Sequence, residues 1–143
     1  MIALSIRQPF AGAVATGWKT VENRSQMFTH RGTFLIHAGT RFHAWGERAT
    51  AEVEALSGHQ VPMAGGPGGP TAWQYGAIIG VADLYAAHRG CDGSCSPWAH
   101  PGDVHHLIRD ARPLRLPVPC PGRLGPFTPA PEVLDRVREV WPR

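Results

Sequence analysis

Hydrophobic residues gather in short runs separated by turn residues, which is typical of alternating strands and helices. Runs with the character of strands occupy residues 2–6, 33–38, 77–84, 104–108 and 114–120. Apolar residues at helical spacing occupy residues 10–17, 42–56 and 131–141. With one further strand near residue 21, these five or six short strands and three helices predict a small α+β barrel.

Glycines and prolines inside these runs sharpen the prediction. Gly39 is expected to end one strand, and Gly80 inside another indicates a bulge or a bend of the barrel. Pro117 and Pro119 cannot donate to a strand ladder, so they predict an edge position for residues 114–120. In the helix over 42–56, the positions that should face the core are Trp45, Ala49, Val53 and Leu56.

The length of 143 residues predicts one domain over residues 1–143, large enough to bury a core without disulfides or metal. The 17 glycines and 14 prolines predict many turns and long loops. The segment PMAGGPGGP cannot hold regular structure. We therefore expect a flexible loop over residues 62–75 within the domain.

The charge of the chain weakly favours nucleic acid over an acidic ligand as a partner. The formal net charge is +3 and the isoelectric point is near 9.1, and the arginines are spread along the chain without a basic run. No apolar run is long enough to cross a bilayer, and Arg7 and Pro9 interrupt the pattern of a signal peptide. Three cysteines in such a chain indicate thiols or metal ligands in place of a disulfide framework. We expect a cytoplasmic protein that does not associate with membranes.

Lys19 is the only lysine in the chain, beside thirteen arginines. A lysine is a compact ammonium whose pKa falls on burial, so it can act as a base or nucleophile as well as contact a phosphate. The alternative is a lysine that is simply solvated on a loop. Strand alternation would place Lys19 on the face of Val21. The opposite face would carry Thr20, Glu22 and Arg24, unless a bulge intervenes.

A second group of reactive residues lies in the segment HRGCDGSCSPWAH. Its two thiols and two imidazoles are enough ligands for a tetrahedral zinc, and they belong to His88, Cys91, Cys95 and His100. The Cys-x3-Cys spacing occurs in zinc sites, but no separate second pair anchors it, so free thiols in a surface loop are the favoured alternative. Apart from this zinc, no cofactor is expected. The nearby His105 and His106 should point to opposite faces of a strand, so that only one of them can face a cleft.

Four sequence blocks in order cover most of the chain: LSIRQPFAGAVATGWKTVENRS, RGTFLIHAG, GAIIGVADL and HHLIRDARPLRLPVPCPGRLGPF. The first contains the pattern GxKxxExR, on Gly17, Lys19, Glu22 and Arg24. These blocks and this signature resemble the ASCH domain family. The resemblance implies a PUA-like fold, a small β-barrel with short flanking helices, and a cleft lined by the signature. It also implies one of several activities, which are nucleic-acid binding, amidohydrolysis of N4-acylated cytidine, and cleavage of single-stranded RNA.

A cleft of this kind suits single-stranded RNA or one modified nucleoside. Basic side chains hold phosphates, while carboxamides and carboxylates read the edges of bases. We expect the cleft to be built by Gln8, Lys19, Glu22, Arg24 and His37, with Arg7 and Arg41 at its rim. Trp18 or Trp73 would stack on an unpaired base, although packing in the core or in a loop is an equal alternative for both.

A small hydrolase is the main alternative. It would use Lys19 as a base of lowered pKa, Glu22 as a proton carrier and the Thr20 hydroxyl. Amidohydrolase members resemble a Lys-Thr-x-Thr pattern, and Glu22 replaces the second threonine here. Ribonuclease members resemble a pattern with a tyrosine before the signature lysine, where this chain has small residues and Phe10. Recognition is therefore predicted over hydrolysis. Two further hypotheses are an ion pair of Lys19 with Glu22 that only orders the cleft, and a module that binds proteins.

Overall fold

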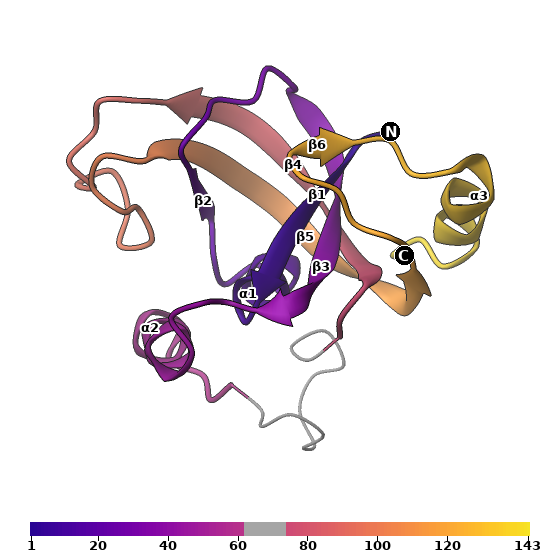
Figure 1. Ribbon diagram of the computed structural model, residues 1–143, viewed down its shortest axis with the longest axis horizontal. Coiled ribbons are helices and arrows are strands. Elements are labelled where there is room, and N and C mark those ends of the chain that lie inside the picture. The colour runs from indigo at the N-terminus through magenta and orange to yellow at the C-terminus, as the bar shows by residue number, and fades with distance from the viewer. Residues whose placement is uncertain (62–73) are drawn as a thin grey trace.

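Six strands form one curled sheet with three short helices against it, in a computed structural model that describes residues 1–61 and 74–143 (Figure 1). The strands are β1 Ala3–Gln8, β2 Val21–Arg24, β3 Gly32–Phe42, β4 Ala77–His88, β5 Val104–Pro119 and β6 Pro126–Phe127. The helices are α1 Phe10–Ala15, α2 Glu47–Ser57 and α3 Pro131–Glu139. The predicted α+β fold with short flanking helices is confirmed, although β3, β4 and β5 are long strands of 11, 12 and 16 residues.

The sheet has the order β2-β5-β4-β3-β1-β6. β1 and β3 run parallel, and the other neighbouring strands run antiparallel. The sheet curls into a half-barrel, which brings β2 close to β1 although three strands separate them in the sheet. The guanidinium of Arg24 in β2 spans the remaining distance and donates to the Ser5 carbonyl oxygen of β1 at 2.7 Å.

Hydrophobic side chains are buried on both faces of the sheet. In β3, Phe34 and Ile36 belong to a core that includes α1, whereas Leu35 between them belongs to a second core that includes Val137 of α3. Strand residues alternate between the two faces, so burial of both faces needs apolar residues at every position. This explains why β3 appears in the sequence as a continuous apolar run.

Gly80 allows α1 to approach the sheet closely. A Cβ at this position would lie 2.9 Å from the Ala15 Cβ and 3.0 Å from the Arg112 carbonyl oxygen. The ladder between β4 and β5 shifts its register between Ile78 and Gly80. The predicted bulge at Gly80 is therefore confirmed, and its physical reason is the contact with the helix.

Three strands run well beyond their predicted ends, and one of them is β4, which continues past Leu84 to His88. β3 continues through Gly39 to Phe42, so the predicted break at Gly39 is wrong. β5 is one strand of 16 residues in place of two, and only its first part lies between β2 and β4. Residues 114–119 pair with β4 alone among the strands, so the predicted edge position is confirmed for them. The pairing with β2 ends at Leu107. The prolines of β5 lie beyond that point, in the half that pairs with β4, which is why the ladder tolerates them.

The second helix begins later than predicted because β3 continues to Phe42 and a turn over residues 44–46 follows it. It begins at Glu47, and Ala49 and Val53 are buried as expected. Trp45 precedes the helix, and it is 38% exposed, as is Leu56. The expectation that Trp45 and Leu56 face the core is therefore wrong. The Trp45 ring lies at the surface instead.

The predicted flexible loop over 62–75 lies almost entirely outside the described residues, and so does Trp73. Within residues 1–61 and 74–143, no helix has the length and apolar character needed to span a membrane.

Candidate functional site

A cleft of about 810 Å³ opens where β1, β2 and the end of β3 approach one another. The loop between β4 and β5 and the segment between β5 and β6 complete its walls. Five basic side chains and two carboxylates line it, those of Arg7, Lys19, Glu22, Arg24, Arg41, Asp103 and Arg123. Five of them, from Lys19, Glu22, Arg24, Arg7 and Arg41, were predicted as site residues from the sequence.

Lys19 lines the cleft although only 2% of its surface is exposed. Its Nζ donates to the Val21 carbonyl oxygen and lies 5.3 Å from the centre of the Phe10 ring. Burial lowers the pKa of the Lys19 ammonium, and the Glu22 and Glu52 carboxylates partly oppose this shift. An ammonium carries three donors, so the bond to Val21 leaves donors for a bound group.

Glu22 lines the same cleft, and its side chain is also buried. One carboxylate oxygen, Oε1, lies 3.7 Å from Nε of Arg24. The other, Oε2, is buried without a hydrogen-bond partner among the described residues. The ion pair of Glu22 is thus with Arg24, while Lys19 uses a backbone carbonyl. Leaving a buried carboxylate oxygen unpaired is costly, which marks Oε2 as an acceptor for a bound group.

The signature side chains share the cleft because β2 begins only at Val21. Gly17 adopts φ of +84° after α1, and the Lys19 amide then donates to the Ala13 carbonyl oxygen at 2.9 Å. Lys19 therefore lies before the strand and outside its alternation. Thr20 is exposed and is not among the cleft residues. The alternation that would separate Lys19 from Glu22 and Arg24 does not occur, and the reason is a turn before the strand and not a bulge within it.

The His106 ring of β5 is hydrogen-bonded to the backbone of β2 and of the segment that follows β2. It lies opposite Glu22 in the ladder, and its Nε2 accepts the Phe28 N–H at 3.0 Å. Nδ1 therefore carries the proton and donates to the Glu22 carbonyl oxygen at 3.3 Å. Burial lowers the pKa of His106, which favours this neutral ring. His105 and His106 point to different neighbours, as expected, but neither belongs to the cleft lining.

Aromatic rings form one wall of the cleft. Ring centres lie 5.0 Å apart for Phe10 and His43, 4.9 Å for His43 and Trp45, and 5.2 Å for Trp45 and His100. The Arg48 guanidinium lies 4.5 Å from the Trp45 ring. Burial and the nearby Arg7 lower the pKa of His43. We refer to Phe10, His43, Trp45 and His100 as the aromatic wall.

Three exposed arginines lie at the rim, Arg7, Arg41 and Arg123. Among the described residues, none of them forms an ion pair with a carboxylate. Leu124, beside Arg123, is fully exposed. The rim therefore carries positive charge that no described carboxylate neutralises directly.

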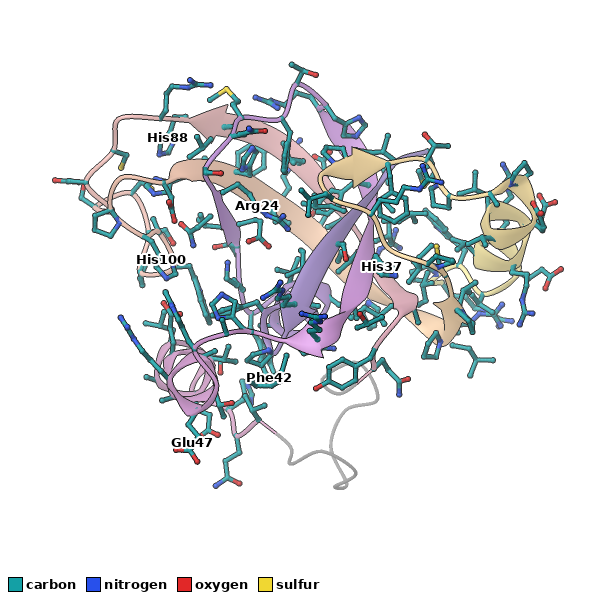
Figure 2. The ribbon with its side chains drawn as sticks, viewed as in Figure 1. Arg24, His37, Phe42, Glu47, His88 and His100 are labelled. Carbon is teal, nitrogen blue, oxygen red and sulfur yellow. The ribbon has the colours of Figure 1, made fainter. Side chains whose placement is uncertain are left out.

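His37 lines the cleft, but both of its ring nitrogens have protein partners. Nε2 donates to the Cys120 carbonyl oxygen at 2.6 Å, so Nδ1 accepts from the Ser5 hydroxyl at 2.9 Å. Burial lowers the pKa of His37, in keeping with a neutral ring. A Cβ at Gly122 would lie 2.7 Å from the ring, so this segment packs closely on it. The ring is positioned to hold the β5–β6 segment against the cleft (Figure 2).

Gln8 and Trp18 are not among the residues that line the cleft. The Gln8 carboxamide accepts the Gly12 N–H and donates to the Gln74 carbonyl oxygen, both at 2.9 Å. The Trp18 ring stacks on His59 at 4.5 Å and packs against the core. The structure thus brings together the signature and the rim arginines, and it places these two residues elsewhere.

The reactive residues after β4 form a separate group, which we call the Cys/His cluster. Its ligand atoms all lie within 4.8 Å of one another, and they belong to His88, Cys91, Cys95 and His105. The predicted ligand His100 is replaced by His105, which lies at the start of β5 with its Nδ1 3.5 Å from Cys95 Sγ. The three cysteines of the chain are free. The Gly93 N–H, and also Cys95 and His88, lower the pKa of the Cys91 thiol to about 6, which favours its thiolate.

His100 belongs to the cleft and not to the cluster. Its Nε2 lies 2.7 Å from the Glu52 carboxylate of α2. Its amide donates to Asn23 Oδ1 at 2.8 Å, and Asn23 Nδ2 donates to the Trp98 carbonyl oxygen at 2.9 Å. Figure 2 shows His88, at the end of β4, and His100, on the chain that joins β4 to β5, on the same side of the molecule.

Sequence reasoning missed several cleft residues, namely His43, Trp45 and His100 of the aromatic wall, Asn23, and Arg123. His43 and Trp45 follow the apolar run of β3, and aromatic residues just beyond a strand end are a signal that could have indicated a site. His100 and Arg123 come from loops distant in sequence, and no local pattern points to them.

No family model matches the chain. No curated protein matches its sequence. Among solved structures, the chain is similar to ASCH from Zymomonas mobilis, with a TM-score of 0.58 and 16% identity over 97% of this chain and 94% of that chain. A mutant of the same Zymomonas mobilis protein matches with a TM-score of 0.58 and 17% identity over 96% and 94% of the two chains. The resemblance predicted from the sequence is thereby confirmed for the fold: the chain has the fold of ASCH domain proteins, which is a PUA-like α+β fold.

Proposed function

We propose that the chain is an ASCH domain that binds an unpaired nucleotide, in single-stranded RNA or as a modified nucleoside, in a basic cleft. The observation that carries this proposal is the combination in one cleft of an exposed tryptophan ring, a buried pair of polar groups and arginines at the rim. A base, a sugar and a phosphate need these three kinds of contact.

The aromatic wall supplies a surface for stacking. Trp45 is partly exposed toward the cleft, and its neighbours His43 and His100 hold it by edge and tilted contacts. Stacking of a base on such a ring contributes about 1–3 kcal/mol. The cleft volume of about 810 Å³ is also sufficient for a nucleotide.

Lys19 and Glu22 supply opposite hydrogen-bonding roles beneath this surface. Lys19 can donate from its ammonium, and Glu22 can accept at Oε2, which has no described partner. A donor beside an acceptor matches the edge of a base, where carbonyl oxygens and amino groups alternate. Both groups are buried, so a mismatched edge would leave one of them unpaired at a cost.

The proposal is tested by fluorescence anisotropy with a labelled ten-nucleotide single-stranded RNA at several salt concentrations. We expect affinity to fall as salt rises, because bound phosphates release counterions. Arg41→Ala and Arg123→Ala should each reduce the magnitude of the logarithmic salt slope by about 0.7. Arg136→Ala is the matched control, because Arg136 is an exposed arginine of α3 outside the cleft.

Binding that is absent at every salt concentration, for RNA and for modified nucleosides alike, would contradict this proposal. The cleft would then be a scaffold feature, and a module that binds proteins would become the better hypothesis. If Arg136→Ala changed the salt slope as much as the two cleft variants do, RNA affinity would depend only on the net charge of the protein.

A second candidate is hydrolysis of an N4-acylated cytidine, and the buried Lys19 of lowered pKa beside Glu22 favours it. A neutral Lys19 amine could take a proton from water, whose oxygen attacks the acyl carbon. The C–N bond then breaks, and the proton passes to the departing amino group of cytidine. The Thr20 hydroxyl is exposed outside the cleft, so water would be the nucleophile. The test is release of acetate from N4-acetylcytidine followed by NMR, and release no faster than with Lys19→Met would argue against hydrolysis.

We also propose that the protein acts in the cytoplasm, a compartment that keeps thiols reduced. Its three free cysteines suit that environment.

A further inference from the structure

We propose that the Cys/His cluster is a structural zinc site. Its four ligand atoms are His88 Nε2, Cys91 Sγ, Cys95 Sγ and His105 Nδ1. Two thiolates and two imidazoles are a common ligand set for tetrahedral zinc. Four protein ligands fill the coordination of the ion, so the site would be structural and not catalytic.

The distances in the cluster agree with this geometry. Zinc bonds of about 2.0–2.1 Å to nitrogen and about 2.3 Å to sulfur place neighbouring tetrahedral ligands roughly 3.3–3.8 Å apart. His105 Nδ1 lies 3.1 Å from His88 Nε2 and 3.5 Å from Cys95 Sγ. All four atoms lie within 4.8 Å of one another. A small adjustment of the side chains would therefore complete a tetrahedron.

The protonation of His105 directs a lone pair into the cluster. Its Nε2 lies 2.6 Å from the His100 carbonyl oxygen, which can only accept, so this nitrogen carries the proton. Nδ1 is then the unprotonated atom, and it faces both His88 and Cys95. A ligating histidine typically donates its other N–H to a carbonyl or carboxylate in this way.

The thiols are held by the turn that carries them. The Gly93 amide lies 3.4 Å from Cys91 Sγ, and the Ser94 amide donates to the Asp92 carboxylate at 2.9 Å. Gly93 has φ of +95°, and a Cβ there would lie 2.9 Å from the Ala99 carbonyl oxygen. The turn is thus fixed by backbone geometry that only glycine allows, and it presents both cysteines to one point.

The site would fix a loop that has no regular structure. Fifteen residues, 89–103, separate β4 from β5 without a helix or strand. Loops longer than about 12–15 residues are uncommon in compact domains unless something orders them. Ligands at both ends and in the middle of this segment would do so. His100 and Asp103 lie in the same loop and line the cleft, so zinc would also stabilise one wall of the cleft.

The first test is the metal content of protein purified without chelator, measured by inductively coupled plasma mass spectrometry. We expect one zinc per chain, and loss of that zinc in Cys95→Ser, which alters an exposed thiol. Cys120→Ser is the matched control, because Cys120 lies outside the cluster. His100→Ala should also keep its zinc, whereas the ligand set predicted from the sequence alone would lose it.

A second measurement uses cobalt(II) in place of zinc. Thiolate ligands give charge-transfer absorption, and a tetrahedral field gives intense visible bands. We expect both in the unaltered protein and in Cys120→Ser, and loss of them in Cys95→Ser. If Cys95→Ser fails to fold, refolding of the unaltered reduced protein with and without zinc decides the question, because structural zinc raises the folded fraction.

The proposal is overturned by reduced protein that contains only a trace of zinc and gives no tetrahedral cobalt spectrum. A disulfide between Cys91 and Cys95 in protein from a reducing preparation would overturn it as well. These outcomes do not depend on whether the cleft binds RNA.

Discussion

The functional groups of the cleft line an open cavity, whereas the ligand atoms of the Cys/His cluster lie close to one another. In the cleft, Lys19 Nζ uses one donor on a backbone carbonyl, and Glu22 Oε2 has no described partner. In the cluster, the thiols and imidazoles converge within 4.8 Å. The cleft is lined by β1, β2 and β3 and the cluster lies at the ends of β4 and β5, all of them strands of one sheet.

This difference indicates the size of the partner that each region suits. Groups that converge within 4.8 Å leave room for an ion, and their nitrogen and sulfur atoms select a metal such as zinc. Groups that surround about 810 Å³ suit a molecule of nucleotide size. The pKa shifts also have different causes: burial lowers the pKa of Lys19, whereas the Gly93 N–H and further hydrogen bonds lower the pKa of the Cys91 thiol against the effect of burial.

One short chain segment connects the two regions. The His100 carbonyl oxygen accepts from His105 of the cluster, while the His100 ring belongs to the cleft. Asn23 of β2 holds this segment through two hydrogen bonds. A change in either region should therefore be transmitted to the other mainly through residues 98–100.

The largest effect on binding is expected for Lys19→Met. Methionine has a similar length but no charge, so the variant loses a charge-assisted hydrogen bond of about 1.5–3 kcal/mol and roughly ten- to hundredfold in RNA affinity. The midpoint temperature of its thermal unfolding at pH 7 should not fall, because the variant no longer has to desolvate a buried ammonium on folding. Titration by anisotropy and thermal unfolding measure the two quantities. Unchanged affinity would remove Lys19 from the recognition site.

The same variant gives a prediction for the pH dependence of stability. The pKa of Lys19 is lowered in the folded protein, so between that value and 10.5 the unfolded chain binds a proton that the folded chain does not. The free energy of unfolding should therefore rise with pH in this window. Lys19→Met should lack this rise, and urea unfolding at several pH values measures the difference. A parallel pH dependence of the two proteins would show that Lys19 is not desolvated.

Trp45→Ala should reduce RNA affinity by about five- to hundredfold, the equivalent of the about 1–3 kcal/mol for one stacked base. Tyr85→Ala is the control, because Tyr85 is an exposed aromatic residue of β4 outside the cleft. Trp45→Phe should recover part of the affinity, since a ring remains available. Equal losses in Trp45→Ala and Tyr85→Ala would show that the aromatic wall has no specific role.

The smallest effect is expected for Asn23→Ala, which removes the link between the two regions. Loss of its two hydrogen bonds should lower the free energy of unfolding by about 1–2 kcal/mol, measured in urea. Asn23→Asp keeps an acceptor for the His100 amide but cannot donate to Trp98, so its loss should be smaller. If both variants are as stable as the original protein, residues 98–100 are held by other contacts.

Much of the fold follows from local patterns in the sequence. The apolar runs place β1, β3 and β4, and the four sequence blocks indicate the PUA-like fold that the structural comparison confirms. The pattern fails for β5, whose middle residues Arg109 and Asp110 are polar although the strand continues through them. Exposed strand positions tolerate polar residues, so hydrophobicity alone divides this strand in two.

The sequence by itself determined the signature, the lone lysine, and the presence of enough thiols and imidazoles for a metal site. It did so because a short motif and a residue count are local properties of the chain. Only the tertiary structure decided that His105 replaces His100 in the cluster, that Trp45 and Arg123 join the cleft, and that Gln8 and Trp18 do not. These assignments depend on the curl of the sheet and on where β2 and β5 begin. Both are set by packing between segments far apart in the sequence, which no local pattern records.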